Sequence, residues 1–203
     1  MNTPAVFQRY INEVLRETLD RHMFIYLDNI LIYSQTVDEH VTHVRRILQL
    51  LIENHLFVKL EKSVFHACTI SFLGFVVSHN KLCMDPTKVK AVENWPRHTS
   101  VHLVQRFLGF TNFYRRFIKN FSAFAASLIT LTRKVSGRFC WSTEPQQAFD
   151  ELKHRLIKAP ILQIPDTELP FVFEVDASEV GDDGVLSQWS EEDKKLHPCA
   201  YFS

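Results

Sequence analysis

The sequence lacks several features that define broad classes of protein. Its 203 residues carry no net charge at neutral pH, so no global electrostatic field draws the chain to nucleic acid or membrane. No apolar run approaches the roughly 18 residues that a membrane-spanning helix requires. No secretory leader is recognised, and the four cysteines have no C-x-x-C spacing. We therefore expect an intracellular protein with reduced thiols, in the cytoplasm or the nucleus, with no membrane partner.

Metal-ligand spacing is also scarce. His40 and His43 lie one helical turn apart, but no partner pair at ligand spacing accompanies them. A solvated helix face is therefore expected at these histidines, and zinc is not.

One long segment has no acidic residue. Between Glu93 and Glu144 the chain carries eight of its 23 Lys and Arg residues, which leaves 15 against 23 acidic residues elsewhere. The eight are Arg97, Arg106, Arg115, Arg116, Lys119, Arg133, Lys134 and Arg138. This asymmetry predicts a local basic surface on a neutral molecule.

Two apolar runs flank the pair Asp28-Asn29 in the stretch from Phe24 to Tyr33. Four apolar residues on each side of a short polar pair predict two short buried strands joined by a tight turn at Asp28-Asn29. Asp and Asn suit such a turn because their side chains tolerate unusual backbone angles. By itself the pattern indicates a core hairpin with a solvated tip.

Helical spacing surrounds this hairpin. Thr3-Pro4 is expected to start a helix ending near Leu19, and Thr36 with Glu39 forms a capping box for a helix ending about His55. Short strands are expected around 56–60, 64–67, 70–77 and 81–84. Further helices are expected from Asp85-Pro86 to before Trp95, over 100–118, over 121–134 and from a cap at Thr143, with a short extended piece at 139–141.

One face of the helix predicted over 100–118 combines amide, glycine and basic residues. These are Gln105, Gly109, Asn112, Arg116 and Lys119. Such a face suits close approach to a phosphate-lined groove. An ordinary solvated face with a packing glycine is the alternative.

Prolines at 160, 165 and 170 mark a linker, and a strand pattern follows it. Strands are expected over Phe171–Val175 and Gly184–Gln188, with a third beginning at His197. A sheet of two or three strands with exposed edges is a poor independent domain.

The motifs occur in an order that resembles the reverse transcriptase of gypsy-type long-terminal-repeat retrotransposons. Pro4 to Gln8 resembles the palm helix beneath the template, and Tyr26 to Ser34 resembles the catalytic Tyr-x-Asp-Asp hairpin. Glu61-Lys62 resembles the next palm element, with Ser63 where the family usually has Cys. Phe72-Leu73-Gly74 is similar to the primer-positioning hairpin, and 106–118 is similar to the thumb. Asp176-Ala-Ser178 with 181–188 resembles the opening of the ribonuclease H domain, with Asp183 where the family usually has glycine.

The resemblance implies an α+β fold: a partial right-hand polymerase palm over 1–95 without fingers, thumb and connection helices over 96–160, and the opening strands of a ribonuclease H-like fold over 161–203. It implies catalytic roles for Asp28, Asn29 and Asp176, with Asp28 and Asp176 as ligands of Mg²⁺ or Mn²⁺. It also implies that a further set of residues contacts an RNA/DNA hybrid or primer–template. The set is Phe7, Gln8, Tyr26, Lys62, Leu73, Gly74, Gln105, Gly109, Asn112, Arg115, Arg116 and Lys119.

The number of carboxylates available at each catalytic centre determines the activity that we expect. Two-metal phosphoryl transfer needs carboxylates converging from separate strands, and each centre here has one, Asp28 or Asp176. Asn29 offers an amide oxygen without charge. The first palm carboxylate would precede residue 1 and the remaining ribonuclease H carboxylates would follow residue 203. We expect weak metal binding at most.

Three functional hypotheses remain open. The first is a retroelement polymerase and ribonuclease H fragment that binds primer–template but is inactive alone. The second is a retained cellular protein that binds nucleic acid or another partner without catalysis. The third is an active subunit completed by a separately encoded polyprotein segment.

Overall fold

The computed structural model describes residues 3–19, 21–97, 99–133, 139–178, 181–191 and 193–203. The chain divides into two compact units, Met1–Cys68 and Thr69–Ser203. Each unit has a hydrophobic core of its own. Among the described residues, no helix is long and apolar enough to cross a membrane. Lys134, Gly137 and Arg138, which the sequence placed in the basic segment and at a helix break, lie outside the described residues.

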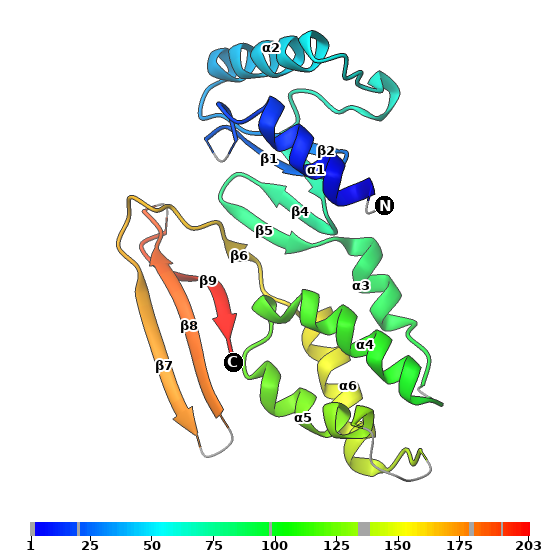
Figure 1. Cartoon of the computed structure of the whole chain (residues 1–203). Coiled ribbons are helices and arrows are strands. Elements are labelled where there is room, and N and C mark those ends of the chain that lie inside the picture. Colours follow the sequence, from blue (N-terminus) through cyan, green and yellow to red (C-terminus); the bar gives the residue numbers. More distant parts are fainter. Residues whose placement is uncertain (1–2, 20, 98, 134–138, 179–180, 192) are drawn as a thin grey trace. The chain divides into compact units, whose positions relative to one another are not determined.

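The first unit packs two helices on a two-stranded antiparallel ribbon (Figure 1). Its elements are α1 (Thr3–Val14), β1 (Met23–Tyr26), β2 (Asn29–Ile32), α2 (Val37–Glu53) and the 3-10 helix η1 (Leu60–Lys62). Ile11 and Leu15 pack with Met23, Ile47 and Leu51 to form the core. The predicted capping box is confirmed, because the Thr36 hydroxyl accepts from the Glu39 amide and the Glu39 carboxylate accepts from the Thr36 amide.

Several local predictions in this unit were wrong. The first helix ends at Val14, and a turn carries the chain on to Leu19. The stretches 56–60 and 64–67 contain no strand, and Phe57 there is 84% exposed. Their apolar residues suggested strands, but an apolar run forms a strand only where a neighbour satisfies its backbone hydrogen bonds.

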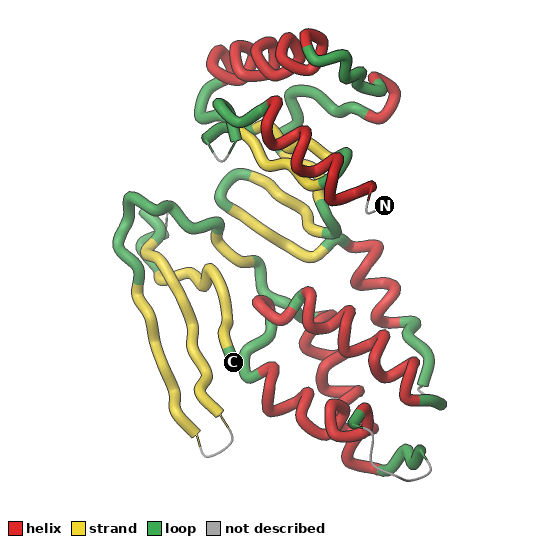
Figure 2. The backbone as a smooth tube through the Cα atoms, viewed as in Figure 1, coloured by secondary structure: helices red, strands yellow, loops and turns green. Residues whose placement is uncertain are grey.

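The second unit combines a four-stranded sheet, a group of helices and a three-stranded sheet (Figure 2). Its strands are β3 (Thr69–Phe72), β4 (Phe75–Ser78), β5 (Lys81–Met84), β6 (Leu162–Gln163), β7 (Val172–Ser178), β8 (Gly181–Trp189) and β9 (Leu196–Phe202). Its helices are α3 (Pro86–Glu93), α4 (Val101–Phe113), η2 (Arg115–Phe117), α5 (Phe121–Thr132) and α6 (Thr143–Ile157). Both sheets are antiparallel, in the orders β3-β4-β5-β6 and β7-β8-β9.

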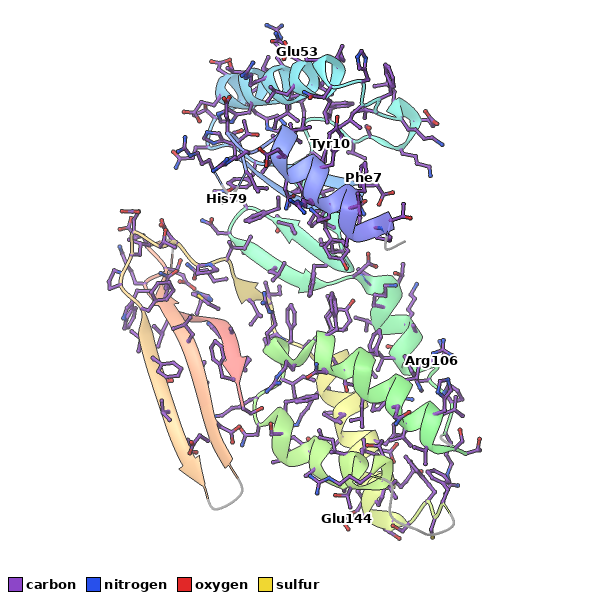
Figure 3. All side chains as sticks on the ribbon, viewed as in Figure 1. Phe7, Tyr10, Glu53, His79, Arg106 and Glu144 are labelled. Atoms are coloured by element: carbon purple, nitrogen blue, oxygen red, sulfur yellow. The ribbon has the colours of Figure 1, made fainter. Side chains whose placement is uncertain are left out.

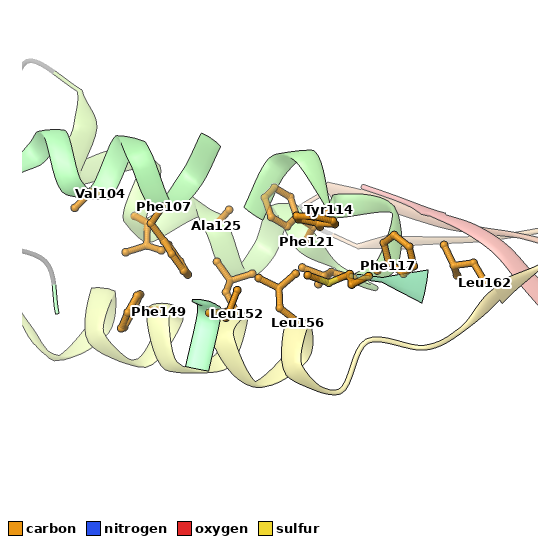
Figure 4. Close-up of a cluster of buried hydrophobic side chains, with 14 residues drawn as sticks. Val104, Phe107, Tyr114, Phe117, Phe121, Ala125, Phe149, Leu152, Leu156 and Leu162 are labelled. Carbon is orange, nitrogen blue, oxygen red and sulfur yellow. The ribbon is translucent and has the colours of Figure 1, made fainter. Parts of the chain in front are cut away.

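Aromatic residues fill the core among α3 to α6 (Figure 4). Phe107 lies edge-on to Phe149 at 4.7 Å between ring centroids, and both rings are at most 3% exposed. Leu152, Leu156 and Leu128 are fully buried beside them. α5 packs on α4 and α6, and α3 packs on α6. The helices predicted over 100–118 and 121–134 are therefore present as α4 and α5, and they pack on each other.

Several boundaries in this unit differ from the predictions, and the strands predicted over 171–175 and 184–188 are the longer β7 and β8. The helix predicted over 100–118 ends at Phe113, and η2 follows it. The stretch predicted as one strand over 70–77 is a hairpin, β3 and β4, turning at Leu73-Gly74. The N-cap of α6 is Ser142 without a side-chain hydrogen bond, so Thr143 is not the cap. β6, within the proline-rich segment, was not predicted.

A candidate nucleic-acid and metal site

The turn at the tip of the first hairpin lies one residue earlier than predicted. Tyr26 pairs with Asn29, so Leu27 and Asp28 form the two-residue loop. Leu27 has φ of 54°, a conformation unusual for a large side chain. The shift follows from strand register, because pairing Ile25 with Ile30 places both on the core-facing side.

A glutamine from α1 holds this turn. The Gln8 side-chain oxygen accepts a hydrogen bond of 2.6 Å from the Leu27 amide. The Gln8 side-chain nitrogen donates to Asn12 Oδ1 at 2.8 Å, which fixes the orientation of the Gln8 amide. Gln8 was predicted to contact nucleic acid, and the structure brings it to the backbone beside Asp28. Asn12 was missed, although its i, i+4 spacing from Gln8 was a usable signal.

The candidate catalytic side chains at this tip are exposed. Asp28 and Asn29 are both open to solvent, and Asn29 begins β2 instead of closing the turn. Phe24 and Tyr26 are 50% and 55% exposed, so the strands expected to be buried form a half-exposed ribbon. Phe7 projects from α1 and is 36% exposed (Figure 3), and Lys62 is exposed at the end of η1.

In the second unit, Asp85 and Tyr114 hold the turn Leu73-Gly74 between β3 and β4. Leu73 and Gly74 both have positive φ, 52° and 82°. The Gly74 carbonyl accepts from the Asp85 amide and from the Tyr114 hydroxyl, both at 3.0 Å. A Cβ at Gly74 would lie 2.6 Å from the Tyr114 hydroxyl oxygen, so this close approach requires glycine.

Tyr114 is 2% exposed and lies edge-on to Phe75, the first residue of β4. Burial and the negative charge of Asp85 raise the pKa of the Tyr114 hydroxyl, so it stays protonated and able to donate. The Thr87 side chain and amide both donate to Asp85, which lowers the pKa of that carboxyl and keeps it charged.

The predicted basic face is exposed along α4 and beyond its end. Gln105, Gly109, Asn112, Arg116 and Lys119 are all exposed. A Cβ built at Gly109 meets no atom within 4 Å, so this glycine is not required by packing. Arg106 also projects from α4 (Figure 3), and its guanidinium carbon is 5.9 Å from the centroid of the Trp95 ring.

Arg115 differs from its neighbour Arg116 because its guanidinium is engaged within the unit. It donates to the Ser203 carbonyl and to Asn112 Oδ1, and it lies 5.5 Å from the Phe121 ring centroid. The guanidinium of Arg115 is therefore already engaged by intramolecular partners.

Asp176 is exposed on β7 directly opposite Asp183 on β8. Strand pairing therefore places two carboxylates side by side, at a position where the family usually has glycine in place of Asp183. Within the part of the chain that the structure describes, no group of three or more His, Cys, Asp or Glu residues is arranged to hold a metal ion. Asp28 and Asp176 remain single candidate ligands, each in a separate unit.

Comparisons with known proteins agree along the chain. Residues 1–77 match the family described as reverse transcriptase (RNA-dependent DNA polymerase), and residues 141–203 match the RNase H-like domain found in reverse transcriptase.

Three curated relatives illustrate the match. The chain is 35% identical over 202 residues to the Pol polyprotein from transposon 297 of Drosophila melanogaster, covering 100% of this chain and 18% of the relative. It is 33% identical to the Pol polyprotein from transposon gypsy of the same fly, covering 92% and 19%. It is 34% identical to the transposon Tf2-7 polyprotein of Schizosaccharomyces pombe, covering 98% and 15%. The chain thus spans less than a quarter of the length of these relatives.

Solved structures of reverse transcriptases also match this chain over nearly its whole length. The foamy viral protease-reverse transcriptase in complex with RNA/DNA hybrid matches with a TM-score of 0.80 and 26% identity, covering 99% of this chain and 27% of that one. The dRH form of the same protein in complex with double-stranded DNA matches with a TM-score of 0.82 and 26% identity, covering 99% and 35%.

Proposed function

The chain belongs to the reverse transcriptase and RNase H-like region of gypsy-type retrotransposon Pol polyproteins, and from this premise we propose that it binds primer–template nucleic acid through its thumb and palm hairpins. The solved relatives are described in complex with RNA/DNA hybrid and with double-stranded DNA. Reverse transcriptases work with divalent metal ions, so the catalytic question concerns which ligands this chain supplies.

The main support for this proposal is the exposed face of α4. Gln105, Gly109 and Asn112 follow one another at helical spacing, and Arg116 and Lys119 extend the same basic segment. The open space at Gly109 leaves the helix backbone accessible to a sugar-phosphate strand. Amide donors and cations that contact phosphate position a duplex without reading its sequence.

Each unit also has a hairpin turn that we include in the proposal, and each turn is argued within its own unit. Leu73, 37% exposed, sits on a turn that Tyr114 and Asp85 hold in place. In the other unit, Phe7, Tyr26 and Lys62 are exposed for contact, while Gln8 acts through the turn that carries Asp28. The predicted roles of these residues in binding are part of the proposal.

The residues present do not fit a two-metal centre. Mg²⁺ is held by one or two carboxylates together with substrate phosphates, and Asp28 could serve as one such ligand. Asn29 adds no negative charge, and it is paired with Tyr26 at the start of β2. Asp176 is likewise a single family-matched carboxylate. We therefore propose that the 203-residue chain alone is inactive in polymerisation and in hybrid cleavage.

Gel-shift titration against salt tests the binding proposal. Affinity for a primer–template duplex should fall steeply as salt rises, because phosphate contacts release counterions. Replacing Arg116 and Lys119 with alanine should weaken binding to all sequences alike and reduce the salt slope by about two. Arg115→Ala should have a smaller direct effect because its guanidinium is already engaged. Arg45→Ala on α2 is the matched control. Unchanged affinity in the Arg116→Ala/Lys119→Ala variant would reject the thumb assignment.

Primer-extension and hybrid-cleavage assays with Mg²⁺ and Mn²⁺ test the proposal of inactivity. Template-dependent extension by the isolated chain would overturn it. Extension only after a polyprotein segment with the other palm carboxylate is added would support the third hypothesis, that of a subunit completed in trans.

A further inference from the structure

The unit Met1–Cys68 contains a recess of about 520 Å³ between the turn that follows α1 and the middle of α2. Three arginines line it, Arg16, Arg21 and Arg46, and its one described acidic residue is Glu17. None of its lining residues belongs to the Leu27-Asp28 turn or to the proposed nucleic-acid surface. We call it the arginine recess.

Positive charge in the arginine recess is only partly compensated. Arg46 pairs with Glu17 at 3.1 Å, and both side chains are substantially exposed. Arg16 and Arg21 form no ion pair with any carboxylate in the described part of the chain. Two guanidinium groups thus lie beside a concave surface without a described acidic partner. Their planar forks match the geometry of phosphate oxygens.

The floor of the recess is packed and hydrogen-bonded. The Thr18 side chain is 9% exposed, and its hydroxyl donates to the Leu15 carbonyl at 3.0 Å. Leu15 and Met23 beneath it are fully buried. The turn that carries Arg16 and Arg21 is therefore held by the core, which lowers the entropy cost of gathering both arginines on one ligand.

Two histidines form part of the wall. The rings of His22 and His43 stack with centroids 3.8 Å apart and an interplanar angle of 15°. The Ser34 hydroxyl is 2.7 Å from Nδ1 of His43 and holds that ring in place. Imidazole N–H groups add donors beside the arginines without requiring further charge.

We propose that the arginine recess binds the phosphate chain of a small polyphosphate anion, either a nucleoside triphosphate or inorganic polyphosphate. The volume lies within the range of small-molecule sites. Two guanidinium groups that pair with no carboxylate among the described residues, on one concave surface, favour a ligand whose negative charges are closely linked. This site does not depend on the proposed primer–template function, because the two share no residue.

Isothermal titration of the full 203-residue chain with tripolyphosphate, ATP and adenosine tests the site. Tripolyphosphate and ATP should bind saturably and adenosine should not. The Arg16→Ala/Arg21→Ala variant should bind at least about tenfold more weakly, since each lost charged hydrogen bond reduces affinity. Arg45→Ala is the matched control, because Arg45 is exposed on α2 beside Arg46 but does not line the recess.

Absence of saturable binding by both polyphosphates would overturn the proposal. A loss of affinity in Arg45→Ala equal to that in the double variant would also overturn it. If the double variant fails to fold, NMR of the unaltered chain decides: the imidazole signals of His22 and His43 should shift on titration with tripolyphosphate. Shifts confined to other residues would refute the site. Binding of short oligodeoxythymidine that the double variant loses, without binding of either polyphosphate, would reassign the recess to nucleic acid and overturn the small-ligand proposal.

Discussion

Individual side chains fix the backbone at both hairpin turns. Gln8 holds the Leu27 amide in one unit, and Tyr114 holds the Gly74 carbonyl in the other. In each case a residue from a helix satisfies a backbone group at a turn with positive φ. Such turns carry local strain that neighbouring contacts must offset.

Replacing Gln8 with leucine should lower the free energy of unfolding of the first unit by about 1–3 kcal/mol, because it leaves the part-buried Leu27 amide without its acceptor. Urea denaturation followed by circular dichroism measures this. Gln49→Leu is the matched control, since Gln49 is exposed on α2 and its side chain donates to the exposed Glu53 carboxylate. Equal losses in the two variants would refute a special role for Gln8.

A substitution at Gly109 tests whether this residue lies on an open contact surface or at a packing position. Gly109→Ala should raise the stability of the free protein by about 0.5–1 kcal/mol, because alanine is the better helix former and its Cβ meets no neighbour. The same change should weaken duplex binding if a nucleic-acid strand approaches the helix backbone there. Thermal unfolding and gel-shift titration measure the two effects. Gln49→Ala on α2 should leave binding unchanged, and unaltered binding by Gly109→Ala would exclude close approach at this residue.

At the scale of elements, the stability of a hairpin depends more on its contacts with neighbouring elements than on the hairpin alone. The turn at Leu73-Gly74 is joined to α3 through Asp85 and to the end of α4 through Tyr114. β7 and β8, in contrast, bring like charges together at Asp176 and Asp183. The first arrangement stabilises the turn, and the second opposes strand pairing.

The hydrogen bond from Tyr114 should make stability depend on alkaline pH. The pKa of Tyr114 is raised in the folded state, so its contribution is full below the ordinary tyrosine pKa of about 10 and is lost as pH rises above it. Tyr114→Phe should lose about 0.5–1.5 kcal/mol at neutral pH and show a shallower alkaline decline. Urea titrations between neutral pH and pH 11 test this.

Two further tyrosine variants test whether the alkaline decline in stability comes from Tyr114. Burial also raises the pKa of Tyr201, so Tyr201→Phe should remove a further share of the alkaline decline. Tyr10→Phe, at an exposed tyrosine with a bond of 3.3 Å to the Asn54 carbonyl, should have little effect at either pH. An alkaline decline as steep in Tyr114→Phe as in the unaltered chain would contradict the assignment.

Asp183→Asn should stabilise the β7-β8 pair by about 0.2–1 kcal/mol at neutral pH, because it removes the carboxylate opposite Asp176. The gain should shrink in high salt, which screens exposed charges. Asp182→Asn is the control, since the residue paired with Asp182 across the strands is Ala177. Thermal unfolding at low and high salt checks both variants, and no difference between them would argue against repulsion.

At the scale of the whole molecule, two separate cores predict two unfolding transitions. The three tryptophans, Trp95, Trp141 and Trp189, all belong to the unit Thr69–Ser203, so their fluorescence reports that unit alone. Far-ultraviolet circular dichroism reports both units. Denaturation curves from the two probes should not coincide. Coincident curves with one midpoint would show that the units unfold together.

The sequence alone determined much of this protein. Apolar periodicity, the capping box at Thr36 and Glu39 and the proline at 86 located α2, α3 and α5, and the motif order identified the family. These features depend on neighbours within a few residues, so they can be read along the chain. The domain boundaries at 95 and 160 and the binding roles remain predictions.

Only the tertiary structure decided which residues act on the turns. The shift of the first turn to Leu27-Asp28, the contacts of Gln8 and Tyr114, the engagement of Arg115 and the pairing of Asp176 with Asp183 each join distant segments. The arginine recess arises in the same way, where the turn after α1 meets α2. Spacing along a chain cannot specify such contacts, because they follow from strand register and from the packing of helices on strands.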